Sequence, residues 1–160
     1  MNPSEEIKEA NASCGCTACV MPGDRLTTRR LLWLWGPVAA WAGFIVIATS
    51  LPAPYLPPQP FQYFDLIEHG SVYGMLGFLL HRAVYKGTRF GPAGLAWGVA
   101  FFGAALFGVC DETHQLFIPS RYFAWSDMGA DVLGVALGTM AYALWRRLSN
   151  RLAGQSGIGC

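Results

Sequence analysis

The chain has 160 residues, of which 53% are hydrophobic and only 13% are charged. This composition is too apolar and too poor in charge for an ordinary soluble domain, so the sequence predicts a small integral membrane protein surrounded by membrane lipids. The net charge is only +1, and the basic residues form no face with interleaved aromatic side chains. Nucleic acid is therefore not expected as a partner.

The first 30 residues are polar and are expected to form a cytoplasmic tail that ends in a basic flank. Within it, Cys14, Cys16 and Cys19 follow a Cys-x-Cys-x-x-Cys spacing that suits a soft metal or thiol exchange. A tail with free thiols is the favoured alternative, because no fourth ligand lies nearby in the sequence.

Four apolar segments have the length and character of membrane-spanning helices, at about 31–51, 66–85, 93–110 and 127–146. A signal peptide is the alternative for the first, since small residues at 48–50 have cleavage spacing, but the full-length apolar run favours an anchor. Residues 52–62 are rich in proline and predict an external loop at the membrane interface, and a second external loop is expected at 111–126.

The basic residues fix a topology for these segments. If the four helices alternate in direction, ten of the eleven Lys and Arg residues lie on one side of the membrane, which the positive-inside rule makes cytoplasmic. The predicted fold is an all-α, integral membrane four-helix bundle with both termini in the cytoplasm. Its expected parts are a polar tail at 1–30, the membrane domain at 31–147 and a short tail at 148–160.

Acidic residues gather at the opposite end of the expected helices. Charged groups at membrane depth cost about 2.5–3.5 kcal/mol each on insertion scales, so their convergence from three distant helix ends indicates a candidate site. Six of the ten acids take part: Asp65, Glu68, Asp111, Glu112, Asp127 and Asp131.

Glycines offer a way to bring those helix ends together. The last three expected helices each carry two glycines four residues apart, a spacing that lets helix backbones approach closely in lipid. These three helices are predicted to form the core of the bundle, with the first helix peripheral. The pairs are Gly70 and Gly74, Gly94 and Gly98, and Gly134 and Gly138.

Asp65, His69 and Tyr73 are spaced to share one face of the second expected helix. A histidine with a carboxylate one turn away is held in one orientation, as a general base or metal ligand requires, and Tyr73 can donate a hydrogen bond one turn deeper. A polar cluster at the helix entry, without further function, explains the same three residues.

At the end of the third expected helix, Glu112 and Gln115 are neighbours if the helix continues, and Glu112 can act as a base, a ligand or a partner for Arg121. Asp111 and His114 are expected to point away from that face. Arg121 is the sole external cation, and its guanidinium suits either a structural salt bridge or a bidentate contact with phosphate.

Ser126 and Asp127 begin the fourth expected helix, where helix capping is the simplest explanation. Asp131 lies one turn further in, and a carboxylate at that depth needs a partner, for which His69, Tyr73 and Arg121 are the candidates. A divalent metal held by His69, Glu112 and Asp127 is compatible with these residue types, although their spacing matches no recognised metal motif. No motif indicates a cofactor, and nothing in the sequence indicates an oligomeric state.

Together these residues resemble the VanZ-like family of small bacterial membrane proteins, over residues 31–147. The family usually has Asn in place of Asp131 and Gly in place of Ser120. The motifs that carry the resemblance are Asp65-x-x-x-His69-x-x-x-Tyr73-x-x-x-Gly77, then Glu112-x-x-Gln115, followed by Arg121, Ser126, Asp127, Gly134 and Gly138.

The resemblance implies a multi-pass protein of the bacterial inner membrane, and the founding member of the family is associated with low-level resistance to teicoplanin. Two functions fit the residues. One is an enzyme or binder for an anionic lipid-linked or peptidoglycan-related substrate, with His69, Glu112, Arg121 and Asp127 in catalytic roles. The other is a non-catalytic accessory protein whose polar cluster locks the bundle or docks a partner. Transport fits poorly, because no helix is broken and no repeat is visible.

Overall fold

The structure, a computed structural model, describes residues 28–52, 60–61, 63–87, 93–119, 121 and 123–155. In these residues it contains helices and no strand, which confirms the all-α prediction. The cysteines of the N-terminal tail, most of the proline-rich loop and the last five residues lie outside the described residues. The helices are α2 (Thr28–Thr49), α3 (Phe64–Gly87), α4 (Ala93–Gln115) and α5 (Trp125–Gln155).

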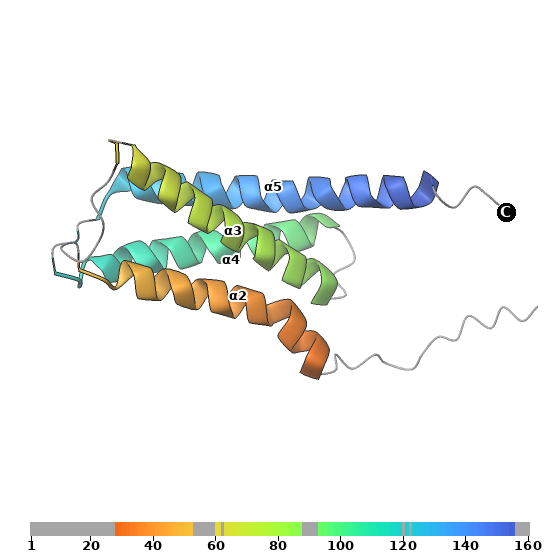
Figure 1. Cartoon of the computed structure of the whole chain (residues 1–160), viewed down its shortest axis with the longest axis horizontal. Helices are drawn as coiled ribbons and strands as arrows, with labels where there is room; N and C mark the ends of the chain where they lie inside the picture. The colour runs from red at the N-terminus through yellow and green to blue at the C-terminus, as the bar shows by residue number, and fades with distance from the viewer. Residues whose placement is uncertain are drawn as a thin grey trace, which may run out of the picture.

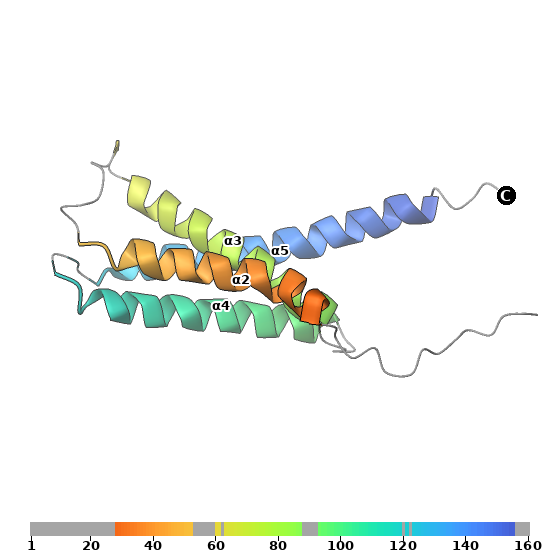
Figure 2. The same cartoon turned by 60° about the horizontal axis from the view of Figure 1, so that its bottom comes forward.

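The four helices lie side by side, and each runs in the opposite direction to the one before it (Figure 1). Thr28 and Gln155 consequently lie at the same end of the bundle, and α5 extends beyond the other helices there, as Figure 2 also shows. Helix α2 bends in its first part, close to Pro37, whose ring and missing N–H disturb a helix interior.

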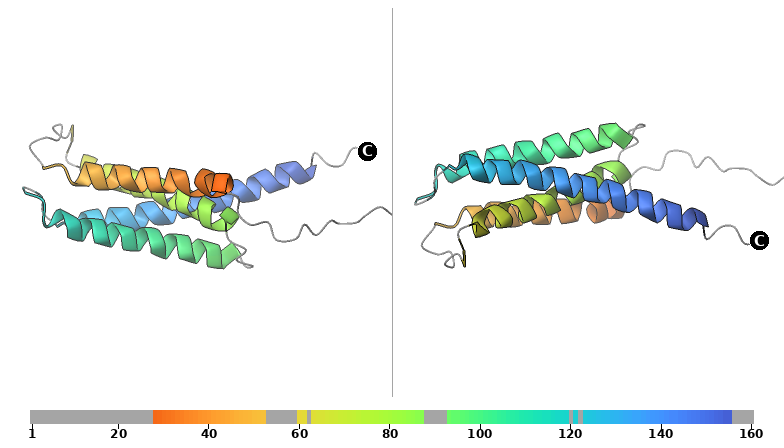
Figure 3. Two further views of the ribbon diagram at one scale, coloured as in Figure 1. Left: turned by 90° about the horizontal axis from the view of Figure 1, so that it is seen from below. Right: turned by 90° about the horizontal axis from the view of Figure 1, so that it is seen from above.

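Helix α3 is the centre of the arrangement, since it contacts α2, α4 and α5. Helices α4 and α5 also contact each other, whereas α2 touches α4 only slightly and does not contact α5. Figure 3 shows α2 and α5 on opposite faces of the bundle. Helix α2 nevertheless contributes the buried Ile45 to the hydrophobic core, so the prediction of a core made by the last three helices, with the first one peripheral, holds only in part.

Two of the glycine pairs account for the close packing of α3 on α5. A methyl group built on Gly134 would overlap the carbonyl oxygen of Gly70, and one on Gly138 would overlap the carbonyl oxygen of Gly74. The helix backbones therefore touch where no side chain intervenes, as expected for small residues four apart.

The prediction for the third pair was wrong. Gly94 and Gly98 have nothing within 4 Å of an added Cβ, so neither contributes to packing in the described residues. On α4 the close approach is instead at Gly108, where a Cβ would lie 3.3 Å from a ring carbon of Tyr73 and 3.5 Å from Asp131 Oδ2. The glycine spacing had selected the wrong turn of this helix.

The outer surface of the bundle is apolar. Phe102 on α4 and Ile47 on α2 expose 69% and 68% of their surface, and Leu133 on α5 exposes 61%. Helices α2, α4 and α5 are long and apolar enough to cross a membrane; the central helix α3, which has charged residues near both ends, is not among them. Exposed apolar side chains on this scale fit contact with lipid, and the chain is a membrane protein.

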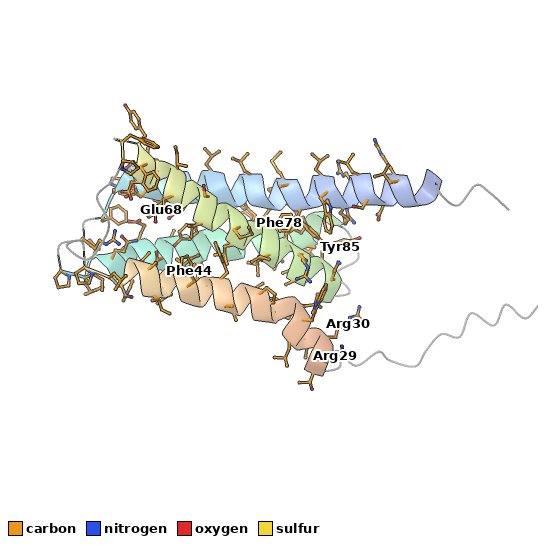
Figure 4. All side chains as sticks on the ribbon, in the orientation of Figure 1. Arg29, Arg30, Phe44, Glu68, Phe78 and Tyr85 are labelled. Atoms are coloured by element: carbon orange, nitrogen blue, oxygen red, sulfur yellow. The ribbon has the colours of Figure 1, made fainter. Side chains whose placement is uncertain are left out.

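Acidic and basic side chains mark opposite ends of the bundle. Figure 4 shows Glu68 at one end and Arg29 and Arg30 at the other. At the basic end, the guanidinium of Arg82 lies 4.0 Å from the ring centroid of Trp33, and Lys86 lies over the same ring. Arg146 of α5 lies over the ring of Tyr85. These stacked side chains match the aromatic and basic residues that anchor helices at a membrane interface.

Candidate functional site

At the acidic end, α4 continues further than the sequence indicated. Residues 111–115 were expected to belong to a loop, but they complete α4, which ends at Gln115. On a helix, Asp111 and Gln115 are one turn apart and Glu112 is adjacent, so all three face the bundle and are buried. The expectation that Asp111 points away was wrong, whereas His114 is exposed as predicted and contacts Ser50.

Asp111 is the best-bonded carboxylate of the cluster. Its Oδ1 accepts a 2.8 Å hydrogen bond from Thr49 Oγ1, and its Oδ2 accepts a 2.9 Å bond from the Tyr73 hydroxyl. The amide of Gln115 approaches Oδ2 at 3.4 Å. Asp111 thus links α2, α3 and α4, and we call Asp111, Thr49, Tyr73 and Gln115 the bonded set. Nothing in the sequence indicated that Thr49 would be a partner of Asp111.

His69 pairs with Asp131. Its Nδ1 lies 3.0 Å from Asp131 Oδ1, and the two side chains expose 11% and 2% of their surface. His69 is therefore the candidate partner that Asp131 contacts. The carboxylate that orients the imidazole is Asp131 on α5 and not Asp65 on the same helix as His69. Since a carboxylate only accepts hydrogen bonds, Nδ1 carries the proton in this contact.

Two buried carboxylate oxygens have no hydrogen-bond partner in the described part of the chain. They are Oδ2 of Asp131 and Oε2 of Glu112. The other oxygen of Glu112 has a 3.5 Å contact with the Gln115 amide, and the carboxylate also interacts with the backbone N–H of Ala124. Buried polar atoms are rarely left unpaired in proteins, and each such atom needs an explanation. We call His69, Glu112 and Asp131 the open set.

The geometry groups ligating atoms in two overlapping ways. One atom each from His69, Glu112 and Asp131 lie within 4.8 Å of one another, and so do one atom each from Asp65, His69 and Asp127. The first group is largely buried and the second is half-buried, with His69 common to both. The metal set considered from the sequence differs by one residue from the buried group, because Asp131 takes the place of Asp127.

Arg121 lies at the same end but makes no ion pair with any described carboxylate. Its Nε donates a 3.3 Å hydrogen bond to the carbonyl of Leu51 at the end of α2. The structural salt bridge, one of the two roles expected for it, is therefore not formed within the described residues. Ser126 Oγ donates to Asp127 Oδ1 at 3.0 Å in the first turn of α5, a contact between two side chains that caps no backbone N–H.

A further buried polar residue lies in the other half of the bundle. His81 donates through Nδ1 to the carbonyl of Thr139 at 2.9 Å and packs edge-on against Tyr142. This contact joins α3 to α5 away from the acidic end. His81 continues the four-residue spacing of the Asp65 to Gly77 motif on α3, so this spacing could have indicated it from the sequence.

A match to a known protein family shows to which family the chain belongs. The family described as VanZ/LLP1 matches residues 32–146. The chain belongs to that family. The match spans every candidate residue from Asp65 to Asp131, which confirms the VanZ-like resemblance. No curated protein and no solved structure matches the chain.

Proposed function

We propose that this VanZ-family protein is a multi-pass protein of the bacterial inner membrane, with four crossings and both termini in the cytoplasm. The segregation of charge supports this orientation, because Arg29 and Arg30 lie at the end opposite Glu68. Helix α3 crosses with its charged residues near its two ends and its centre covered by α2, α4 and α5. Residues 31–147 form the membrane domain, and 1–30 and 148–160 are its cytoplasmic flanks.

We further propose that the acidic end is a binding site, at the outer membrane face, for an anionic lipid-linked or cell-envelope substrate. The observation that carries this proposal is the pair of unpartnered buried oxygens on Glu112 and Asp131. Buried polar atoms without a hydrogen-bond partner lower the stability of a protein, and such a cost is tolerated where the atoms bind a ligand. The half-buried side chains of Asp65, His69 and Asp127 connect these oxygens with the surface.

Each residue has a distinct role in this proposal. His69 acts as a base or ligand oriented by Asp131, Glu112 acts as a second acid or base, and Arg121 contacts a phosphate of the substrate. Asp127 supports His69 from the surface side. The guanidinium of Arg121 is available because no described carboxylate pairs with it.

A structural function is the second candidate, and the bonded set favours it. Asp111 accepts hydrogen bonds from Thr49 and Tyr73 and thereby joins three helices. We assign the locking of the bundle to this set and the binding of substrate to the open set. The two functions then occupy neighbouring parts of one cluster.

A cellular assay tests the proposal. Teicoplanin susceptibility is measured in a bacterial host that expresses the wild type, Glu112→Gln or Arg121→Lys, together with folded yield in detergent; Arg151→Lys at the basic end is the control. We expect the wild type and the control to lower susceptibility and both site variants to lose this effect at normal yield. A collapse of yield in both site variants would instead assign these residues to holding the bundle.

A further inference from the structure

The acidic end has an imbalance of charge that bears on how it could bind an anion. Three carboxyl groups are buried there, on Asp111, Glu112 and Asp131. In the described residues, the one ion pair that any of them makes is with His69, and that pair needs a protonated imidazole. An anionic substrate would meet repulsion from these groups, which Arg121 alone does not offset.

We propose that His69, Glu112 and Asp131 bind a divalent transition-metal ion of the manganese or zinc type. Imidazole and carboxylate are ligands that such ions accept, and three ligands from three helices fix a position while leaving further coordination positions free. The inference rests on the proposed function in one respect, since the ion is the group that would meet the phosphate of the substrate.

The unpartnered oxygens are the independent observation that points to a cation. Glu112 Oε2 and Asp131 Oδ2 are buried, and each residue as a whole exposes only 1% of its surface. An oxygen in this state lacks a proton donor, and a cation satisfies it directly. The contrast with Asp111 supports this, because both oxygens of that carboxylate already have donors.

The distances suit a metal ion after a small adjustment. With the ion in place of the Nδ1 proton, the 3.0 Å between His69 Nδ1 and Asp131 Oδ1 subtends about 90° at an ion about 2.1 Å from each atom, an angle that metal sites commonly have. The three ligating atoms lie within 4.8 Å of one another, whereas two ligands on opposite sides of such an ion are about 4.2 Å apart. An ion would therefore draw the most distant pair of ligating atoms together by up to about 0.6 Å, from 4.8 Å to about 4.2 Å.

Glycine 108 keeps space beside this group. It lies on α4 opposite Asp131, and an added Cβ would be 3.5 Å from Asp131 Oδ2. A longer side chain at this position would cover the unpartnered oxygen. The absence of a side chain therefore leaves room on the α4 side of Asp131 Oδ2, which is itself buried from solvent.

The half-buried group of Asp65, His69 and Asp127 is the competing location for an ion. Its carboxylates are accessible to water, so they do not require a cation, and no unpartnered buried atom belongs to Asp65 or Asp127. We therefore assign the ion to the buried group, and the variants below separate the two locations.

The test is metal binding by the full-length protein in detergent, after removal of metal with a chelator. Cys14, Cys16 and Cys19 are replaced by Ser in every sample, so that thiolates do not bind the probe. Mn²⁺ is titrated and its free concentration is followed by electron paramagnetic resonance, and Zn²⁺ is then added as a competitor. We expect one Mn²⁺ per chain, displaced by Zn²⁺.

Four variants locate the ion. Loss of a supporting residue near a metal costs about 10–100-fold in affinity, so loss of a direct ligand in Glu112→Gln or Asp131→Asn should weaken binding at least about 100-fold. Asp127→Asn removes a residue that supports His69 and should weaken binding by about 10-fold, less than the loss of a ligand, whereas the exposed neighbour Glu68→Gln should change it less than about threefold. Asp131→Asn provides a second measurement if Glu112→Gln fails to fold.

Three outcomes would overturn the inference: no stoichiometric binding of either ion by the parent protein, full binding by both Glu112→Gln and Asp131→Asn, or an equal loss in Asp127→Asn. A protein that binds polyprenyl phosphate but no metal would remove this inference and leave the proposed function standing. A protein that binds the metal but not the lipid would keep the inference and reject the anionic substrate.

Discussion

Replacing Gly138 by alanine should disrupt the contact on which the bundle depends most. The new methyl group would overlap the carbonyl oxygen of Gly74, which belongs to the backbone of α3 and has no rotamer that avoids the clash. Overpacking of this kind costs about 1–3 kcal/mol, and alanine in a helix interior returns about 1 kcal/mol relative to glycine. Because the clash is with fixed backbone, we take the upper end of the overpacking range and expect a net loss of about 2 kcal/mol in the free energy of unfolding.

Gly98→Ala is the matched control, because it is the same substitution in a helix with nothing within 4 Å of the added Cβ. It should leave stability unchanged or raise it by up to about 1 kcal/mol. Both variants are unfolded in mixed micelles with increasing dodecyl sulfate and followed by tryptophan fluorescence. Equal stability of Gly138→Ala and the wild type, or a larger loss in Gly98→Ala, would refute the account of α3–α5 packing.

The bonded set and the open set should respond differently in the same unfolding assay. Asp111→Asn keeps one acceptor oxygen but turns an amide donor toward either the Thr49 or the Tyr73 hydroxyl, and should cost about 1–3 kcal/mol; stability equal to wild type would contradict the bonding described. Tyr73→Phe removes the hydrogen bond to Asp111 and should cost about 0.6 kcal/mol, the average for such bonds between membrane helices. A larger loss than that of Asp111→Asn would contradict the central role given to Asp111. Glu112→Gln should leave stability unchanged or raise it, because an unpartnered buried carboxylate becomes an uncharged amide. A loss of about 2 kcal/mol or more, the size expected for a broken buried hydrogen bond, would show that contacts hold Glu112 in place.

Much of the fold followed from the sequence. Apolar length and the proline-rich break at 52–62 predicted the positions of the four helices, and the glycine pairs predicted a close approach of the last three helices, which the structure shows for the pairs of α3 and α5. The error at Gly94 and Gly98 has a simple cause: spacing shows that two glycines share a helix face, but not whether that face meets another helix.

The site was predictable as a gathering of residues but not as a set of contacts. The acids at three helix ends indicated one end of the bundle, whereas the partner of each depended on the exact end of α4. Once α4 continues to Gln115, Asp111 turns inward and becomes the most fully bonded carboxylate. The His69–Asp131 and Thr49–Asp111 contacts join residues 62 apart in sequence, which local periodicity does not relate.

The most direct test of the proposed function is lipid retention by the protein in bilayer nanodiscs, measured by native mass spectrometry with polyprenyl phosphate and the uncharged polyprenol as matched ligands. The wild type should retain the phosphate form preferentially. Glu112→Gln and Arg121→Gln should lose that preference while unfolding as the wild type does. Equal retention of both lipids by the wild type, or an unchanged preference in both variants, would contradict the assignment of the open set and Arg121 to an anionic substrate.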